Sequence, residues 1–548
     1  MKRILSFFVV ALMFVATGSA CTNFIVGKKA SADGSVFISY SADSYGMSGF
    51  VAHYPAAVHP AGAMRDVYDW ESEELLGRIP EAPVTYNVLG NINEYQVAIA
   101  ETTFGGRPEL VDTTGILDYG SLICIALQRS KTAREAIDVI TSLVAEYGYY
   151  SSGESFSIAD PNEAWILEMV GKGGKEKGAV WVAVRIPDDC ISAHANQSRI
   201  RKFDMNDKEN VRYSKDVIKF ARKMGYFDGK DADFDFAAAY CPADFGGLRY
   251  CDARVWSFFN MFADADMNEY LAWASGDATA EPMPLYLKPK APLSLQDVQR
   301  GMRDHYEGTP FDITQDVGAG PYNTPYRVSP LSCEVDGKTY FNERPISTFQ
   351  TAFTFVAQLR SFMPDAVGGV MWFGTDDSNM VVYTPVYCSA TSVPDCYARA
   401  YADPVEFSWK SSFWVFNWVA NMIYPKYSMV IDDMRKVQGE LENSIYEQSL
   451  ALETEVLEIL KYSPRYAVEK LTEFTCNSAE YALAEWKAFA EKIIVKYNDF
   501  VVKGEKDGKI ERSKTGLAGR LSRPGYTKEF WKSIAEQTGD RYLMPEAK

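Results

Sequence analysis

Short runs of β-branched and aromatic residues follow the first twenty positions of the chain. Residues 21–27 and 34–40 form two such runs, and Ala32-Asp33-Gly34 lies between them as a turn signal, so the pattern predicts a β-hairpin. A further strand pattern covers residues 94–103. Apolar residues then recur at helical spacing over 116–128 and 130–146, and we expect Ser130 to cap the second helix and Gly148 to end it.

Strand patterns dominate again over residues 155–159, 164–170, 179–186 and 190–196. Turn-forming residues separate them, which predicts an antiparallel meander of four strands. Another strand pair is expected at 368–373 and 380–385, and helical periodicity runs from about residue 428 to 502. The sequence therefore predicts an α+β body over residues 21–427, with a helical C-terminal part over 428–548 packed against it.

The first twenty residues are typical of a secretory signal. Lys2 and Arg3 precede an apolar stretch over residues 4–15, and Gly18-Ser-Ala20 provides a small-residue cleavage site. The alternative, a retained membrane anchor, would need roughly 20 apolar residues, and no second apolar segment of that length follows. We therefore expect an exported protein, periplasmic or secreted, that has no membrane contact after cleavage and begins at Cys21.

Charge and composition narrow the class of partner. The chain has 548 residues, with 56 Lys and Arg against 73 Asp and Glu, and a formal net charge of −17. Nucleic-acid binding requires clustered positive charge, so a small molecule or peptide is the expected partner. With only four His residues and no Cys-x-x-Cys motif, the sequence implies no metal and no organic cofactor. The oligomeric state cannot be read from it.

Nine cysteines are an odd number, so at least one thiol stays unpaired even where disulfides form. Cys21 is the candidate for that thiol. Cys241 and Cys251, and likewise Cys388 and Cys396, are near enough in sequence to close small loops. The sequence does not decide the connectivity.

A cysteine at a new N-terminus combines a nucleophile and a base in one residue. The α-amine has an unperturbed pKa of about 7.7–8 and can accept the thiol proton at neutral pH, as in N-terminal threonine nucleophiles. The alternative is a lipoprotein in which Cys21 is acylated and chemically silent. Against that alternative, Gly18 stands where lipoproteins usually have Leu, and a strand pattern starts at once instead of a flexible linker.

Several motifs in order along the chain carry a family resemblance. They are Cys21-Thr-Asn-Phe-Ile-Val-Gly-Lys-Lys-Ala-Ser-Ala-Asp-Gly-Ser35, Ser41-Ala-Asp43, Asn93-Glu94, Glu101-Thr-Thr103, His194-Ala-Asn-Gln-Ser-Arg-Ile200, Arg254-Val-Trp256, Tyr306-Glu-Gly-Thr-Pro310, and Trp372 before Val386-Tyr387. With these motifs the chain resembles the cysteine dipeptidases of the N-terminal-nucleophile (Ntn) hydrolase superfamily. The resemblance continues along most of the chain after residue 20 and implies a four-layer αββα sandwich as the catalytic domain.

The resemblance also implies roles for five residues. Cys21 becomes the nucleophile, Asp43 orients its amine, Asn196 donates to the oxyanion, and Arg254 belongs to the site. Thr103 takes the position of the second oxyanion donor, although the Asn found there in bile salt hydrolases is absent.

The residues alone leave other interpretations open for these positions. Asp43 also fits a turn, Asn196 a strand end, and Arg254 a surface ion pair with Asp252. His194 is expected to be structural, because the Cys21 amine already provides a base.

One position departs from the superfamily. Tyr40, three residues before Asp43, replaces an Arg that is common there. The departure leaves the substrate preference open. We therefore expect a dipeptidase acting on small peptides, with two alternatives: an N-acyl amide hydrolase of the bile salt or penicillin V acylase kind, and a non-catalytic lipoprotein anchored at Cys21.

Overall fold

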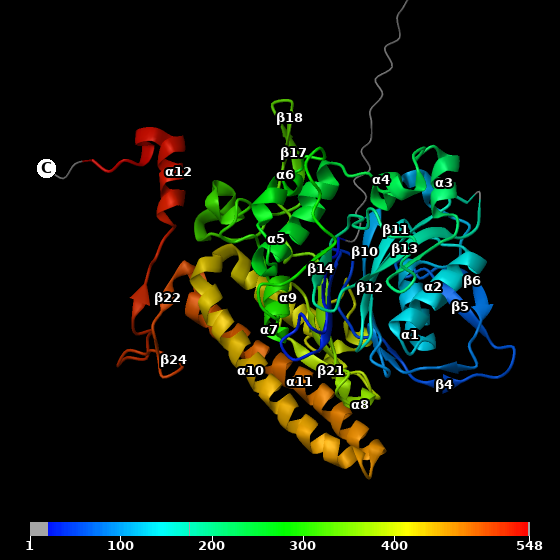
Figure 1. Cartoon of the computed structure of the whole chain (residues 1–548). Helices are drawn as coiled ribbons and strands as arrows, with labels where there is room; N and C mark the ends of the chain where they lie inside the picture. Colours follow the sequence, from blue (N-terminus) through cyan, green and yellow to red (C-terminus); the bar gives the residue numbers. More distant parts are fainter. Residues whose placement is uncertain (1–19, 175, 546–548) are drawn as a thin grey trace, which may run out of the picture.

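Two antiparallel sheets form the centre of the protein in a computed structural model that describes residues 20–174 and 176–545 (Figure 1). The predicted signal segment, apart from Ala20, lies outside the described residues. The first sheet has seven strands in the order β16 (Tyr286–Leu287), β14 (Ile191–His194), β1 (Asn23–Val26), β2 (Val36–Asp43), β19 (Thr351–Leu359), β20 (Gly369–Thr375) and β21 (Thr384–Tyr387). The second has eight, in the order β15 (Val211–Tyr213), β13 (Ala179–Ile186), β12 (Ala164–Gly171), β11 (Gly153–Ala159), β10 (Ala98–Gly105), β9 (Ile92–Asn93), β8 (Val88–Leu89) and β3 (His53–Tyr54).

The hairpin predicted after residue 20 is confirmed as β1 and β2, which pair with Ile25 opposite Ile38. On its other side β2 pairs with β19 along its whole length, from Val36 opposite Leu359 to Asp43 opposite Thr351. Every residue of β1 and β2 is buried, because the second sheet covers one face and helices cover the other. The strand that ends at Asp43 is therefore held from both edges and both faces.

The predicted four-strand meander is only partly right. β11, β12 and β13 pair in sequence as expected, but β14, which corresponds to residues 190–196, leaves that sheet and pairs with β1 instead, with His194 opposite Asn23. The free edge of β13 is taken by β15. Sequence periodicity cannot distinguish these partners, since each strand has two edges and the pattern records only its faces. This crossing is what brings residues 194–196 to the Cys21 end of β1.

The two sheets pack on each other through β2, which contacts β10 and β11. Helices α1 (Tyr119–Arg129) and α2 (Ala133–Tyr147) pack against β10 to β13, while α5 (Ala253–Phe262) contacts β14, and α7 (Leu295–Met302) contacts β2 and β19. Gly148 ends α2 as expected, but the N-cap is Thr132. The expected cap, Ser130, instead ends α1, where its hydroxyl donates to the Ala126 carbonyl.

Two other strand predictions hold with shifted ends. The pattern at 94–103 becomes β10, which starts later because residues 94–97 form a turn, and the pair expected at 368–385 becomes β20 and β21. Elements that the sequence patterns did not indicate include α9 (Ser412–Ile423) and the exposed hairpin of β17 (Ser332–Val335) and β18 (Lys338–Phe341). Two further pairs of strands are β4 (Ala57–Val58) with β7 (Val84–Thr85), and β5 (Met64–Tyr68) with β6 (Leu75–Pro80). Short helices are α3 (Val217–Met224), α4 (Phe236–Tyr240), α6 (Leu271–Ala274) and α8 (Asp365–Gly368).

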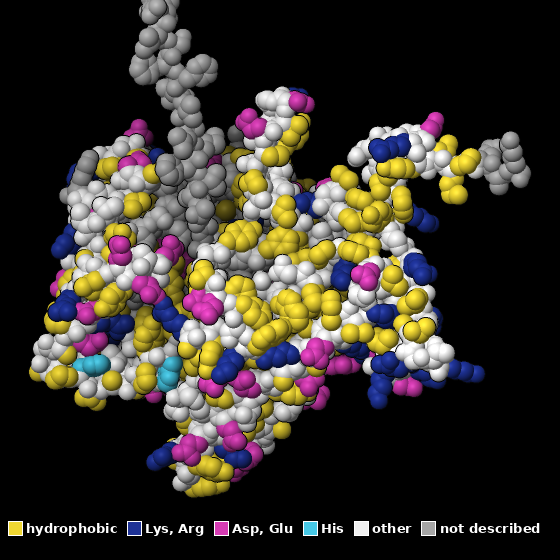
Figure 2. All heavy atoms as spheres, turned by 180° about the vertical axis from the view of Figure 1, so that it is seen from behind, with side chains coloured by type: hydrophobic (Ala, Val, Ile, Leu, Met, Phe, Trp, Pro, Cys, Tyr) yellow, Lys and Arg dark blue, Asp and Glu magenta, His cyan; other side chains and the backbone are white. Residues whose placement is uncertain are grey.

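The expected C-terminal helices are α10 (Tyr427–Leu460) and α11 (Pro464–Tyr497), which pack on each other and contact β21 (Figure 1). The chain after them is not wholly helical. It forms the small pairs β22 (Val502–Lys503) with β25 (Leu521–Ser522) and β23 (Glu505–Lys506) with β24 (Lys509–Ile510), and then α12 (Lys528–Thr538). Lys and Arg side chains gather on this side of the molecule (Figure 2). In the part of the chain that the structure describes, no helix combines the length and apolar character needed to span a bilayer.

Candidate active site

Cys21 lies two residues before the start of β1, between the two sheets, and its side chain is fully buried. Its Sγ is 3.5 Å from Oε1 of Glu101, on β10, and 3.6 Å from the Tyr40 hydroxyl, on β2. Burial, followed by the nearby Glu101 and Asp43 carboxylates, raises the pKa of the Cys21 thiol well above its usual value. With Ala20 still attached, the thiol is therefore held in its neutral form.

Asp43, the last residue of β2, forms a buried ion pair with Arg344 and accepts a hydrogen bond of 2.6 Å from the Thr351 hydroxyl. Burial raises the pKa of the Asp43 carboxyl, and Arg344 opposes that rise. The same two residues bind the residue before Cys21. The Asp43 carbonyl accepts from the Ala20 N–H at 2.8 Å, and the Arg344 guanidinium donates to the Ala20 carbonyl.

Arg254, from the first turn of α5, is buried and is not the surface ion pair that its sequence neighbour Asp252 suggested. Its guanidinium donates to the Cys21 carbonyl at 2.6 Å and to Oδ1 of Asn196 at 2.9 Å. Burial and the nearby Arg344 lower the pKa of Arg254. Arg254 thus connects the Cys21 backbone to the Asn196 side chain, which makes it a positioning residue in this structure.

Asn196 follows β14 and has a φ of 63°, a left-handed conformation that Asn adopts more readily than most residues. Its Nδ2 donates to the Thr103 carbonyl at 2.7 Å, while Arg254 fixes its oxygen. Because both ends of the amide are held, its orientation is set before any substrate arrives. Thr103 presents its carbonyl to Asn196, and its hydroxyl donates to Oε2 of Glu154 at 2.9 Å. Its expected role as a backbone N–H donor stays a prediction.

His194 has the structural position expected from the sequence. Its Nδ1 lies 2.7 Å from the Thr102 hydroxyl and its Nε2 lies 2.7 Å from the Ser157 hydroxyl. These partners are on β10 and β11, so the imidazole of β14 joins the two sheets. Burial lowers the pKa of His194 to about 3, which leaves the ring neutral and unsuited to act as a general base near pH 7.

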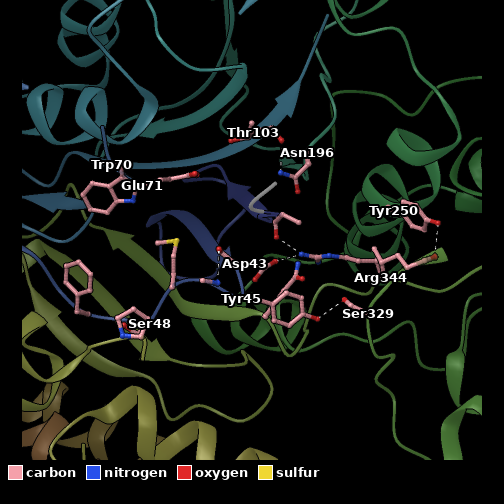
Figure 3. Close-up of a pocket in the computed structure, with 18 of the residues that line it drawn as sticks. Asp43, Tyr45, Ser48, Trp70, Glu71, Thr103, Asn196, Tyr250, Ser329 and Arg344 are labelled. Atoms are coloured by element: carbon pink, nitrogen blue, oxygen red, sulfur yellow. Dashed lines mark hydrogen bonds and ion pairs between the residues drawn. The ribbon is translucent and has the colours of Figure 1, made fainter. Parts of the chain in front are cut away.

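Two adjoining cavities open on these residues. The outer one, of about 1550 Å³, is lined by Asp43, Thr103, Asn196, Arg254 and Arg344 among others, and Figure 3 shows Arg344 directed at Asp43 and Asn196 beside Thr103. The inner one, of about 60 Å³, is lined by Cys21 together with Asp43 and Glu101. The structure thus brings all five residues expected from the sequence into one region, where Cys21 borders the inner cavity.

Sequence reasoning assigned no role to three residues of this region: Glu101, Arg344 and Glu154. A signal existed for Glu101, because it interrupts the apolar strand pattern Ala98-Ile-Ala-Glu-Thr-Thr-Phe104. No signal marked Arg344, which lies 301 positions from Asp43.

The cysteines and the candidate metal ligands add no further site. All nine thiols are free, so neither loop-closing disulfide that the spacing allows is formed. Within residues 20–174 and 176–545, no group of three or more His, Cys, Asp or Glu side chains is arranged to hold a metal ion.

Comparisons with known proteins agree with this geometry. The model of Peptidase family C69 matches residues 20–440. The chain is 30% identical over 407 residues to a probable dipeptidase of Salmonella dublin, covering 71% of this chain and 85% of the relative. It is 27% identical over 429 residues to a probable dipeptidase of Latilactobacillus sakei, covering 75% and 82%, and 26% identical over 458 residues to dipeptidase A of Lactobacillus helveticus, covering 79% and 86%. The resemblance to the cysteine dipeptidases is thereby confirmed, and the chain belongs to peptidase family C69.

Proposed function

We propose that the protein is an exported dipeptidase whose nucleophile is the Cys21 thiol, activated when residues 1–20 are removed. Cleavage after Ala20 converts the Cys21 amide into an α-amine of suitable basicity. The amine takes the thiol proton, and Sγ attacks the peptide carbonyl. The proton then passes to the leaving nitrogen as the C–N bond breaks. Water hydrolyses the thioester, which releases the first amino acid and restores the thiol.

The observation that carries the proposal is the convergence of four residues on Cys21 and the residue before it. Arg254 holds its carbonyl, Asp43 and Arg344 hold the residue before it, and Asn196 is fixed nearby by Arg254. An amide N–H of Asn196 is suited to stabilise the tetrahedral oxyanion, a contribution worth about 10²–10³ in rate. Asp43 is suited to bind the ammonium that forms when the amine accepts the thiol proton.

The fold supports the same proposal. Two facing antiparallel sheets, with α1 and α2 against one and α5 and α7 against the other, are the arrangement expected of the four-layer αββα sandwich that we propose. In Ntn hydrolases the N-terminal residue of the mature chain is the nucleophile. The neutral thiol of the form that retains Ala20 is consistent with activation by cleavage, since that form has no α-amine at residue 21.

A lipid-anchored binding protein fits the structure poorly. The Cys21 side chain is fully buried between the sheets, and an inner cavity of about 60 Å³ has no room for a diacylglyceryl group. The acylated form would have to pull Cys21 and its strand out of the sheet. Mass spectrometry of the mature N-terminal peptide distinguishes the free amine from the acylated cysteine.

The test uses protein that begins at Cys21 and a Cys21→Ala control prepared in the same way. Both are incubated with a dipeptide library, N-acetyl dipeptides, a conjugated bile salt and penicillin V, and products are followed by mass spectrometry. We expect Cys21-dependent hydrolysis of free dipeptides. Hydrolysis of the bile salt or penicillin V, with dipeptides left intact, would replace the dipeptidase assignment by an N-acyl amide hydrolase.

A further inference from the structure

A buried carboxylate without a cation stands beside the proposed nucleophile. Glu101 is 1% exposed, and its Oε1 lies 3.5 Å from Cys21 Sγ and accepts a hydrogen bond from Tyr40. We infer that Glu101 binds the α-ammonium group of the substrate's first residue and thereby restricts the enzyme to peptides with a free N-terminus. This inference rests on the proposed dipeptidase function and names the group that would make it an exopeptidase.

The Glu101 carboxyl shares its negative charge with a second buried carboxyl, that of Glu154. Thr103 is opposite Glu154 across the β10–β11 ladder, and Glu101 precedes Thr103 by two positions on the same face of β10, so the two carboxyls are diagonal neighbours. Buried carboxyls in contact share one proton, which leaves one negative charge. Burial raises the pKa of both Glu101 and Glu154.

No described positive group neutralises that charge. Among residues 20–174 and 176–545, no Lys, Arg or His forms an ion pair with Glu101 or Glu154 within 4.0 Å. Glu101 Oε2 and Glu154 Oε1 are buried and find no hydrogen-bond donor among the described residues outside the pair. A buried charge is costly unless a partner compensates it. A cationic group of the substrate would be that partner.

Covalent geometry determines which cation of a peptide fits. The α-nitrogen lies about 2.5 Å from the carbonyl carbon of its own residue, and an attacking Sγ must approach that carbon to about 3–3.5 Å. These distances allow an oxygen 3.5 Å from Sγ to come within hydrogen-bond reach of the α-nitrogen. The ammonium of a Lys side chain is several bonds further from the carbonyl and would pass beyond Glu101.

The surroundings of Glu101 favour a small cation. The inner cavity has a volume of about 60 Å³, and its lining includes six aromatic side chains, Tyr40, Phe50, Tyr54, Trp70, Tyr119 and Phe353. That space suits a few water molecules or one ammonium group, but not an extended Lys or Arg side chain. Aromatic faces also attract cations, and the low polarity of the walls strengthens the pairing with Glu101.

The experiment compares Ala-Leu with propionyl-Leu, which is the same molecule without the amino group, on the mature enzyme. Wild type should prefer Ala-Leu by on the order of 10- to 100-fold in kcat/KM, the range expected for a hydrogen bond between charged groups. Glu101→Gln should remove most of that preference, because it should slow the hydrolysis of Ala-Leu far more than that of propionyl-Leu. Glu154→Gln keeps the Glu101 charge and should keep the preference.

Glu109→Gln provides the charge-matched control, because Glu109 is exposed and lines neither cavity. Equal losses on both substrates in Glu101→Gln would overturn the inference, since they would mean that Glu101 serves the thiol or the enzyme's own amine. A preference in Glu101→Gln that matches that of Glu109→Gln would overturn it as well.

Should Glu101→Gln fail to fold, wild type alone decides the question through its pH profile. The substrate ammonium has a pKa of about 8, so kcat/KM for Ala-Leu should fall above that pH while the propionyl-Leu value does not. Identical alkaline limbs would refute the inference. If neither this dipeptide nor any in the library is cleaved in a Cys21-dependent way, the proposed function itself fails. Cleavage without preference for a free amine removes only the role of Glu101.

Discussion

Lowering the pH from 7 to 5 should reduce the free energy of unfolding through one side chain, the His194 imidazole that joins the two sheets. In the folded protein the pKa of His194 is lowered to about 3 by burial, whereas an unfolded chain has a His pKa of about 6.5. Below pH 6.5 the unfolded state therefore binds the proton and the folded state does not. The contribution of His194 to stability is fully present above pH 6.5 and declines as the pH falls toward 3.

The size of this loss of stability depends on how far the pH lies below the pKa of His in the unfolded chain. At pH 5 that distance is about 1.5 pH units, and each unit corresponds to about 1.4 kcal/mol, so the loss from this one residue is about 2 kcal/mol. A His194→Gln variant removes the titrating group and retains one amide donor and one acceptor for the two hydroxyls. The variant should be less stable than wild type at pH 7 because the bridge is imperfect, but it should lose about 2 kcal/mol less between pH 7 and pH 5.

Urea unfolding of mature wild type and His194→Gln at both pH values measures this difference. A direct check is available because the chain has four His residues, so His signals in an NMR titration are few enough to assign by the variant. The His194 signal should not titrate between pH 7 and pH 4. A midpoint near 6.5, or equal loss of stability in the two proteins, would refute the reasoning.

Three further outcomes test the catalytic assignment. Cys21→Ala, and a form that keeps one extra residue before Cys21, should both fold and show no turnover of dipeptides. Circular dichroism checks the fold, and activity in either protein would contradict the mechanism. Asn196→Ala should lower kcat at least tenfold with a small change in KM, as expected for a group that acts on the transition state; steady-state kinetics at wild-type rates would contradict this. Asp43→Asn should reduce kcat and shift the acid limb of the pH–rate profile, and an unchanged profile would show that Asp43 does not face the amine.

Sequence patterns predicted the strands best where turn residues bound an apolar run on both sides. β13 was located to the residue, because Gly178 and Pro187 border it. β14 was found but placed in the wrong sheet, since its pattern records which faces are buried and not which edge is paired. The N-terminus of α2 was missed because Ser130 and Thr132 are both good caps, and only the end of α1 decides between them.

The candidate site was predictable where chemistry concentrates in a motif. Cys21 was predicted from the residues themselves, because a cysteine after a small-residue cleavage motif would supply both a thiol and an α-amine. The resemblance supplied the other four residues. Arg344 and the Glu101–Glu154 pair depend on the way distant segments fold together, which periodicity and spacing do not report. Arg254 shows the same limit differently, because its neighbour in sequence, Asp252, is not its partner in space.

The hydrogen bonds that hold the Ala20 backbone affect when the bond between Ala20 and Cys21 could be cleaved. Ala20 is hydrogen-bonded to the Asp43 backbone and to Arg344, and Cys21 beside it has no exposed surface. A separate processing peptidase needs an accessible segment on both sides of the bond that it cuts, and on the Cys21 side of the Ala20–Cys21 bond the folded protein offers no exposed side chain. If the proposed activation holds, removal of residues 1–20 would either precede closure of the sheet or be carried out by the folded body itself. A precursor that folds before cleavage would then accumulate as a stable, inactive product whenever the second route is closed.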